Sequence, residues 1–121
     1  MNYRHAFHVG NHADILKHAT LALCLEHLRR KATPFVVMDT HAGRGLYGLG
    51  GEEAQRSPEW RDGVGRLWDW PDAPADLAPL MAAIGAANDG GDLLAYPGSP
   101  LQALTGMRPE DRRATRPAGG V

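Results

Sequence analysis

The stretch VVMDTHAGRGLYGLG, residues 36–50, constrains the fold of this chain more than any other segment. Residues 35–38 are all apolar, without the alternation of a half-exposed strand, which predicts a strand buried on both faces of a parallel sheet. Asp39 is then expected at the carboxyl end of this strand, and Gly43 and Gly45 permit a sharp turn after it. Open α/β sheets bind ligands at that edge, so we predict an α/β fold with a ligand site at this turn.

Three kinds of nucleotide site use a glycine-rich turn after a strand. A phosphate-binding P-loop requires a Gly-Lys-Ser/Thr ending, which the sequence lacks. Residues 43–48 match GxGxxG, but a dinucleotide site needs a helix that starts at the loop, and the glycines within 48–51 disfavour one. The third pattern, Asp39-x-x-x-Gly43-x-Gly45, suits a nucleoside with a cationic amino-acid tail, such as S-adenosylmethionine. A tight turn without a ligand remains the alternative.

Charge is unevenly distributed along the chain. Its 121 residues are enough for one domain and carry 13 Lys and Arg against 14 Asp and Glu, so overall charge does not indicate a nucleic-acid binder. Residues 1–31 contain five Lys and Arg against two acids, whereas residues 52–92 contain three against nine. This distribution allows a local anionic partner at the amino-terminal part and disfavours one in the middle.

Cys24 is the single cysteine of the chain, so an internal disulfide is excluded. Its place in an apolar helical pattern predicts a buried thiol rather than a nucleophile. No apolar run has the length of a membrane span, and the start MNYRHAFHVGNH lacks a hydrophobic signal core. We therefore expect a cytoplasmic protein without a membrane partner.

A long helix is predicted from Asn11 to about Lys31. Asn11 can cap the first turn, in which Asp14 is the third residue, and the basic run 29–31 suits the negative end of the helix dipole. We favour helix termination over RNA contact as the role of this run. The apolar residues recur at helical spacing: Ile15, Leu16, Ala19, Ala22, Leu23 and Leu28.

A helical insert is predicted over residues 52–92. Two amphipathic stretches indicate it: Trp60, Val64, Leu67 and Trp68, then Leu77, Leu80, Met81 and Ile84. The tryptophans and Met81 follow the apolar stripe of an acidic segment, so we interpret them as core rather than as a platform for stacked bases. Residues 93–96 predict a short strand. Ser99 is the expected cap of the next helix, with Pro100 at its first position and Gln102 completing a capping box.

The histidines have structural and functional interpretations. His5, His8 and His12 could surround a zinc ion, but neither paired cysteines nor a metalloenzyme spacing supports this, and we predict no metal site. His41 lies inside the glycine loop, where it could bond its own turn or donate to a ligand carboxylate or ribose. Its position in a loop favours the second role.

Three sequence blocks carry a resemblance to a known family. YRHAFHVGNHADILKH (3–18), DTHAGRGLYGLG (39–50) and YPGSPL (96–101) together resemble the RlmJ-type 23S ribosomal RNA adenine-N6 methyltransferases, in that family's order and spacing. The resemblance covers residues 1 to about 112. It implies a Rossmann-like methyltransferase fold with a helical insert, S-adenosylmethionine as cofactor, and an adenine of 23S ribosomal RNA as acceptor. Full-length members imply a monomer, while the oligomeric state of this chain stays open.

The resemblance also implies site residues, position by position. Three positions match cofactor contacts of the family and four more are expected in the same site: His18, His41 and Ser99, with Lys17, Asp39, Gly43 and Gly45 beside them. Tyr3 and His5 match residues placed near the target base. Lys17 matches a lysine of the active-site region, and Ser99 could cap its helix and also face the cofactor.

The catalytic motif of the family is absent from this sequence. Methylation of an adenine amino group needs acceptors that hold its N–H groups and an aromatic surface that fixes the flipped base before the sulfonium. Family members supply these with an Asp-Pro-Pro-aromatic motif, which does not occur here. We therefore assign no catalytic residue.

The last residues also depart from the family. Where the family has a strand carrying an acid for the cofactor ribose, this chain reads RRATRPAGGV, 112–121, whose proline and glycines predict that it cannot form a central strand. We expect an incomplete methyltransferase domain at 1–112 and an aberrant or disordered tail at 113–121, from a truncated or frame-shifted reading. Two functions remain open: an enzyme by descent that is inactive as this chain, or a noncatalytic fragment that retains cofactor or RNA contacts.

Overall fold

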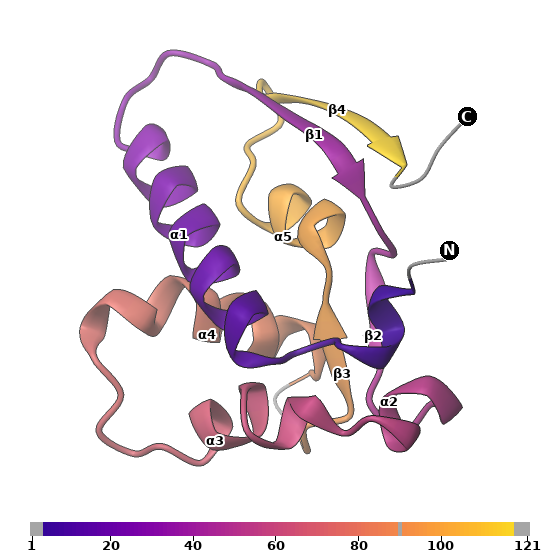
Figure 1. Ribbon diagram of the computed structural model, residues 1–121. Helices are drawn as coiled ribbons and strands as arrows, with labels where there is room; N and C mark the ends of the chain where they lie inside the picture. The colour runs from indigo at the N-terminus through magenta and orange to yellow at the C-terminus, as the bar shows by residue number, and fades with distance from the viewer. Residues whose placement is uncertain (1–3, 90, 118–121) are drawn as a thin grey trace.

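The computed structural model describes residues 4–89 and 91–117 (Figure 1). The described α-helices are α1 His12–Arg29, α2 Glu52–Arg56, α3 Val64–Trp68, α4 Ala78–Ala87 and α5 Ser99–Thr105. The strands are β1 Val36–Ala42, β2 Leu46–Gly48, β3 Ala95–Pro97 and β4 Arg112–Pro117. Short 3-10 turns lie at His5–Phe7, Glu59–Arg61 and Ala75–Leu77. The chain is therefore a mixed α/β structure, as predicted.

The described strands form two pairs. β1 and β4 are parallel, with Val36 opposite Arg112 and Asp39 opposite Thr115, and they lie along the top of the view in Figure 1. β2 and β3 are antiparallel, with Tyr47 opposite Tyr96. A strand, β2, follows the glycine loop where a dinucleotide fingerprint would require a helix.

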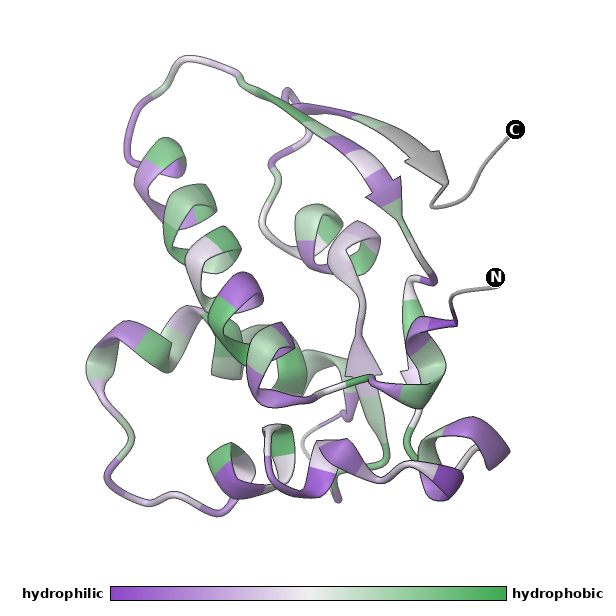
Figure 2. Cartoon of the chain, in the orientation of Figure 1, coloured by the Kyte–Doolittle hydropathy of each residue, from purple (hydrophilic) through white to green (hydrophobic). Residues whose placement is uncertain are grey.

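Strand β1 differs from its prediction in length and in burial. It continues to Ala42, so Asp39 lies within it, although the regular register with β4 ends at Asp39. Val36 and Met38 are 60% and 72% exposed, not buried. The reason is that β1 pairs with β4 alone among the described residues, while α5 packs beside it. Figure 2 shows β1 changing from hydrophobic at its start to hydrophilic toward its carboxyl end.

The prediction of an irregular tail is wrong for residues 113–117, which belong to β4. Asp111 fixes the start of this strand: its carboxylate accepts hydrogen bonds from the backbone N–H of Phe35 at 3.0 Å and of Arg108 at 2.8 Å. The hydrogen bond from the Arg108 side chain lowers the pKa of Asp111 to about 2. Residues 112–117 thus form a strand by backbone pairing with β1, although they contain no apolar run. Pro117 is the last residue of the strand, a position at which a proline is tolerated. Residues 118–121 lie outside the described residues.

Helix α1 begins as predicted. The Asn11 side chain accepts a hydrogen bond from the backbone N–H of Asp14 at 2.9 Å, which satisfies one of the free donors of the first turn. The predicted apolar stripe is only partly buried, since Leu16 is 73% exposed. The buried face instead carries Asp14, His18, Ala19 and Leu25. The predicted burial of Cys24 is wrong, because it lies outside that face and is exposed.

The predicted helical insert at 52–92 contains the helices α2, α3 and α4 and two 3-10 turns, separated by irregular stretches such as 69–74. Val64, Leu80 and Ile84 are fully buried in the core cluster. Trp60, Trp68 and Met81 pack against this cluster, whereas Trp70 is half exposed. Tyr96 on β3 is also completely buried there, so the core lies between the helical segment and the β2–β3 pair.

The predicted capping of α5 is wrong. Ser99 is the first helical residue rather than the cap, Gly98 precedes the helix without a side-chain cap, and the Ser99 hydroxyl donates to Asp39. Gln102 does not complete a capping box, because its side-chain amide donates to the carbonyl of Pro97 at 2.8 Å. Both side chains make contacts outside their own helix, which local sequence signals do not specify.

Candidate functional site

Two adjoining cavities lie where β1, α1 and the start of α5 meet. The first, about 390 Å³, is lined by His5, Asp14, Lys17, His18, His41, Gly43, Arg44, Tyr47, Tyr96, Gly98 and Ser99. The second, about 330 Å³, runs along β1 and includes Val37, Met38, Asp39 and Ala103. Lys17, His18, His41 and Ser99 line both. They therefore form one continuous site at the carboxyl-end half of β1.

Asp39 connects three elements at the second cavity. One carboxylate oxygen accepts the hydroxyl hydrogen of Ser99, and the other accepts from the backbone N–H of His41 at 3.1 Å. The His41 ring contacts the Thr40 hydroxyl at 2.9 Å and remains exposed. His41 thus bonds its own turn and also lines both cavities, while its role as a donor to a ligand stays a prediction.

The glycine turn is held by Tyr47. This buried tyrosine accepts a hydrogen bond from the Arg44 backbone N–H at 3.1 Å, and the Arg44 guanidinium lies over its ring at 5.6 Å. A Cβ atom at Gly43 would collide with the Tyr47 hydroxyl, and one at Gly98 would collide with the Arg44 carbonyl. Glycine is therefore required at both positions by the packing of Tyr47 and Arg44, and the backbone of both residues forms part of the cavity wall.

His18 is the buried histidine of the site. Its side chain lines both cavities, and its Nδ1 lies 2.6 Å from the hydroxyl of Tyr96. Burial lowers the pKa of His18 to about 4; Asp14 opposes this shift and Lys17 adds to it. Burial also raises the pKa of Tyr96. At neutral pH the pair is therefore an uncharged imidazole beside an uncharged phenol.

Asp14 is the buried acid of the site, only 2% exposed. One of its oxygens lies 2.6 Å from Nε2 of His5 and accepts the Gly10 backbone N–H at 2.9 Å, while Lys17 lies 3.8 Å from the other oxygen. Burial acts to raise the pKa of Asp14, but the hydrogen bonds from His5 and Gly10 lower it below its ordinary value. A carboxylate buried in this way anchors both His5 and Lys17 at the cavity wall.

Most predicted site residues meet in this place. Those lining the first cavity are His5, Lys17, His18, His41, Gly43 and Ser99, while Asp39 lines the second. Gly45 lines neither, although its carbonyl accepts the Gly98 backbone N–H at 2.9 Å. Tyr3 lies outside the described residues.

Sequence reasoning did not identify Asp14, Arg44, Tyr47, Tyr96 and Gly98 as site residues. Asp14 was recognised only as a residue of the first helical turn, and its contact with His5 is not a helix-capping contact. A useful signal was present for all five, because Asp14 lies within the quoted block 3–18 and the other four lie within the blocks 39–50 and 96–101. The roles of these four depend on the pairing of β2 with β3, which brings the latter two blocks together.

Neither a metal-binding cluster nor a membrane-spanning helix occurs among the described residues. Over residues 4–89 and 91–117, no group of three or more His, Cys, Asp or Glu side chains is arranged to hold a metal ion. None of the described helices is both long and apolar enough to cross a membrane.

Comparison with known proteins gives the site its context. A cavity beside a parallel strand, walled by bare glycine backbone, is typical of ligand-binding α/β proteins. The family model for the ribosomal RNA large subunit methyltransferase D, RlmJ, matches residues 32–116. The chain belongs to this family.

Curated relatives and a solved structure agree with this assignment. The ribosomal RNA large subunit methyltransferase J of Escherichia coli (strain K12) is 46% identical over 111 residues, which cover 92% of this chain and 40% of that protein. Its namesake from Haemophilus influenzae is 46% identical over 113 residues, covering 93% and 40%. The chain therefore spans about 40% of the length of these relatives. A crystal structure of a Legionella pneumophila protein superposes with a TM-score of 0.81 at 33% identity, covering 88% of this chain and 39% of that one.

Proposed function

We propose that this chain is the amino-terminal part of an S-adenosylmethionine-dependent methyltransferase that modifies the N6 amino group of an adenine in 23S ribosomal RNA. The names of the relatives support a ribosomal RNA methyltransferase. The observation that carries the cofactor assignment is the meeting of His18, His41 and Ser99 around one cavity. A ribosomal RNA substrate also implies that the protein works in the cytoplasm.

The site has the features that S-adenosylmethionine requires. Gly43 and Gly98 line the cavity with backbone alone, and the packing of Tyr47 and Arg44 against them excludes a side chain at either position. The cavity wall offers imidazole N–H donors to a carboxylate or ribose from His18 and His41, while the Ser99 hydroxyl, whose hydrogen goes to Asp39, can accept a hydrogen bond from the ligand. When bound, S-adenosylmethionine supplies an electrophilic methyl group on a sulfonium. An uncharged His18 can contact this cofactor without placing a second cation beside it.

The RNA side of the site is proposed at the amino-terminal segment. Asp14 holds His5 in a 2.6 Å contact, and the His5 ring meets the edge of Tyr47 at a centroid distance of 5.6 Å. A histidine fixed in this way can position an extruded base over the cavity. Arg44 and Lys17 add positive charge at the same wall, which favours an anionic backbone nearby.

We further propose that the 121-residue chain binds the cofactor but does not transfer the methyl group. The sequence contains no Asp-Pro-Pro-aromatic motif, so the acceptors that would hold the adenine amino group are not provided. We therefore expect the chain to bind the cofactor without transferring its methyl group. Purified chain should bind S-adenosylmethionine in calorimetry and fail to incorporate labelled methyl into unmodified 23S RNA.

The binding test has a matched control within the chain. His41→Ala removes a side chain from the cavity wall and should weaken S-adenosylmethionine binding about tenfold or more. His27→Ala alters a histidine in the last turn of α1, which lines neither cavity, and should leave the affinity unchanged. Absence of binding by the wild-type chain would contradict the cofactor assignment, and methyl incorporation would contradict the proposed inactivity.

A further inference from the structure

The contact between Tyr96 and His18 raises the question of which imidazole nitrogen carries the proton. Tyr96 is completely buried, and its hydroxyl lies 2.6 Å from Nδ1 of His18. Two arrangements fit this distance: the phenol donates to a bare Nδ1, or a protonated Nδ1 donates to the phenol. In the first arrangement Nε2 carries the ring proton and can donate to a ligand. In the second arrangement Nε2 is unprotonated and can only accept.

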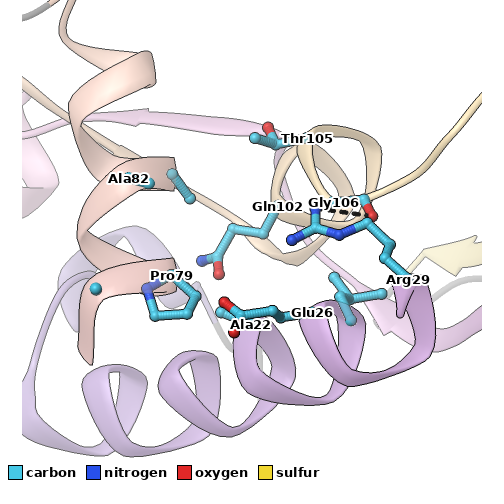
Figure 3. Close-up of a pocket in the computed structure, with 11 residues that line it drawn as sticks. Ala22, Glu26, Arg29, Pro79, Ala82, Gln102, Thr105 and Gly106 are labelled. Atoms are coloured by element: carbon cyan, nitrogen blue, oxygen red, sulfur yellow. Dashed lines mark hydrogen bonds between the residues drawn. The ribbon is translucent and has the colours of Figure 1, made fainter. Parts of the chain in front are cut away.

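Gln102 removes the ambiguity at the phenol. Its side-chain amide lies 2.8 Å from the carbonyl oxygen of Pro97, which can only accept, so the amide must present Nε2 there. Gln102 is only 3% exposed, and Figure 3 shows it reaching from α5 into the space between α1 and α4. Reversal of the amide would place two acceptors together. This orientation is therefore fixed, even though Oε1 has no hydrogen-bond partner among the described residues.

Gln102 does not take the phenol proton. Its amide nitrogen faces the Pro97 carbonyl, and its Oε1 has no hydrogen-bond partner among the described residues, so the Tyr96 hydroxyl does not donate to it. The remaining described partner of the hydroxyl is Nδ1 of His18. A buried hydroxyl donates wherever an acceptor is within reach, so the proton of Tyr96 points to Nδ1.

A bare Nδ1 places the histidine proton on Nε2. Burial keeps His18 uncharged at neutral pH, so the ring carries one proton in total. Nε2 has no hydrogen-bond partner among the described residues and belongs to a side chain that lines both cavities. It is the nitrogen left for a bound molecule.

We infer that Tyr96 is a positioning residue that holds His18 as its Nε2-protonated, uncharged tautomer, so that His18 presents a single N–H donor to an acceptor oxygen of the bound ligand. The ligand's identity rests on the proposed function; the tautomer does not. The carboxylate and the ribose of S-adenosylmethionine both provide such oxygens. A ligand that offered only donors at this point would be disfavoured, because two donors would face each other.

Nitrogen NMR of the histidine-labelled chain tests the tautomer directly. In long-range ¹H–¹⁵N spectra at neutral pH without ligand, His18 should show a protonated Nε2 and an unprotonated Nδ1. Tyr96→Phe removes only the hydroxyl and should shift His18 toward a mixture of the two tautomers. Thr105→Ala is the control, since it removes an exposed hydroxyl that bonds only the Leu101 carbonyl within α5, and it should leave the His18 signals unchanged. A protonated Nδ1 in the wild-type chain would overturn the inference, whatever the variants do.

Ligand titration separates this inference from the proposed function. Tyr96→Phe should bind S-adenosylmethionine about two- to threefold more weakly, because only part of the His18 population then carries the required Nε2 proton. Equal affinity in Tyr96→Phe and wild type would overturn the ligand-facing role of the Nε2 donor. A wild-type chain with the expected nitrogen signals and no affinity for S-adenosylmethionine would support the tautomer and contradict the cofactor assignment alone.

Discussion

The hydroxyl of Ser99 donates a hydrogen bond to the carboxylate of Asp39, which ties the first turn of α5 to β1 across 60 positions of sequence. The same carboxylate accepts the backbone N–H of His41, so one acid connects the helix, the strand and the glycine turn. This contact also explains why Ser99 does not cap its own helix. Its hydroxyl is directed toward β1.

Ser99→Ala should reduce the free energy of unfolding by about 1–2 kcal/mol, because a hydrogen bond to an ionised, partly buried carboxylate is lost. Urea denaturation measures the change. Thr105→Ala in the same helix is the control, since that exposed hydroxyl bonds only the Leu101 carbonyl within the helix. The control should change stability by less than about 0.5 kcal/mol. Equal losses in both variants would contradict the bridging role of Ser99.

Asp14→Asn should destabilise the chain by about 2 kcal/mol, because a buried carboxylate that holds His5 and the Gly10 backbone N–H becomes a neutral amide. It should also weaken RNA binding, since His5 loses its anchor. Asp62→Asn provides the control: that carboxylate is 82% exposed and pairs with Arg66 at 3.4 Å, so its loss should be nearly neutral. Thermal denaturation and RNA gel-shift assays report the two effects. A fully stable Asp14→Asn variant would show that the acid does not anchor this wall.

Local sequence signals predicted the elements better than their contacts. Asn11 predicted the start of α1 because a cap and its helix lie within three residues of each other. Ser99 and Gln102 also matched a capping pattern, yet both side chains bond groups outside their helix. A pattern of residue types cannot reveal a competing partner that only the tertiary fold brings near.

The sequence also did not predict which faces of β1 are buried. The apolar run of β1 predicted a strand with two covered faces, whereas the described structure leaves Val36 and Met38 exposed. The run specifies a strand suited to burial, and the neighbouring elements decide whether burial occurs. The cavity residues were predicted largely from the family resemblance. Tyr96 was not, because its role depends on meeting His18 across 78 positions.

Gly98→Ala should disrupt the site although the substitution adds only one methyl group. The added Cβ would collide with the Arg44 carbonyl and lie 3.1 Å from Cε2 of Tyr47, so the glycine turn must shift. We expect a loss of about 2–3 kcal/mol in unfolding free energy, together with weaker ligand binding. Gly48→Ala is the control, because its Cβ would meet nothing within 4 Å. A stable Gly98→Ala variant with unchanged affinity would contradict the requirement for glycine at this position.

Cys24 should react with a thiol reagent such as dithionitrobenzoate in the folded chain, because it lies on the exposed side of α1. Its modification rate in native buffer should approach the rate in denaturant. Cys24→Ser should change stability by less than about 0.5 kcal/mol, as expected for an exposed position. Reaction only after unfolding would show instead that this side of α1 is covered in solution.

Stability should fall as the pH is lowered from about 6.5 to about 4. His18 has its pKa lowered to about 4 in the folded chain, so over this interval the unfolded chain binds a proton that the folded chain does not. The groups that act on this pKa besides burial are Asp14 and Asp39, which raise it, and Lys17 and His5, which lower it. The resulting loss is about 3 kcal/mol relative to neutral pH.

His18→Gln tests this pH dependence because glutamine can still accept the Tyr96 hydroxyl hydrogen but does not titrate. Urea denaturation at several pH values should show a much flatter stability curve between pH 6.5 and 4 in this variant than in the wild type. Below about pH 4 both proteins should lose stability together, because Asp14 has a lowered pKa and its protonation removes the stability that the buried carboxylate provides. An equal slope above pH 4 in the two proteins would mean that His18 takes up its proton as readily in the folded chain as in the unfolded chain, which would contradict the lowering of its pKa by burial.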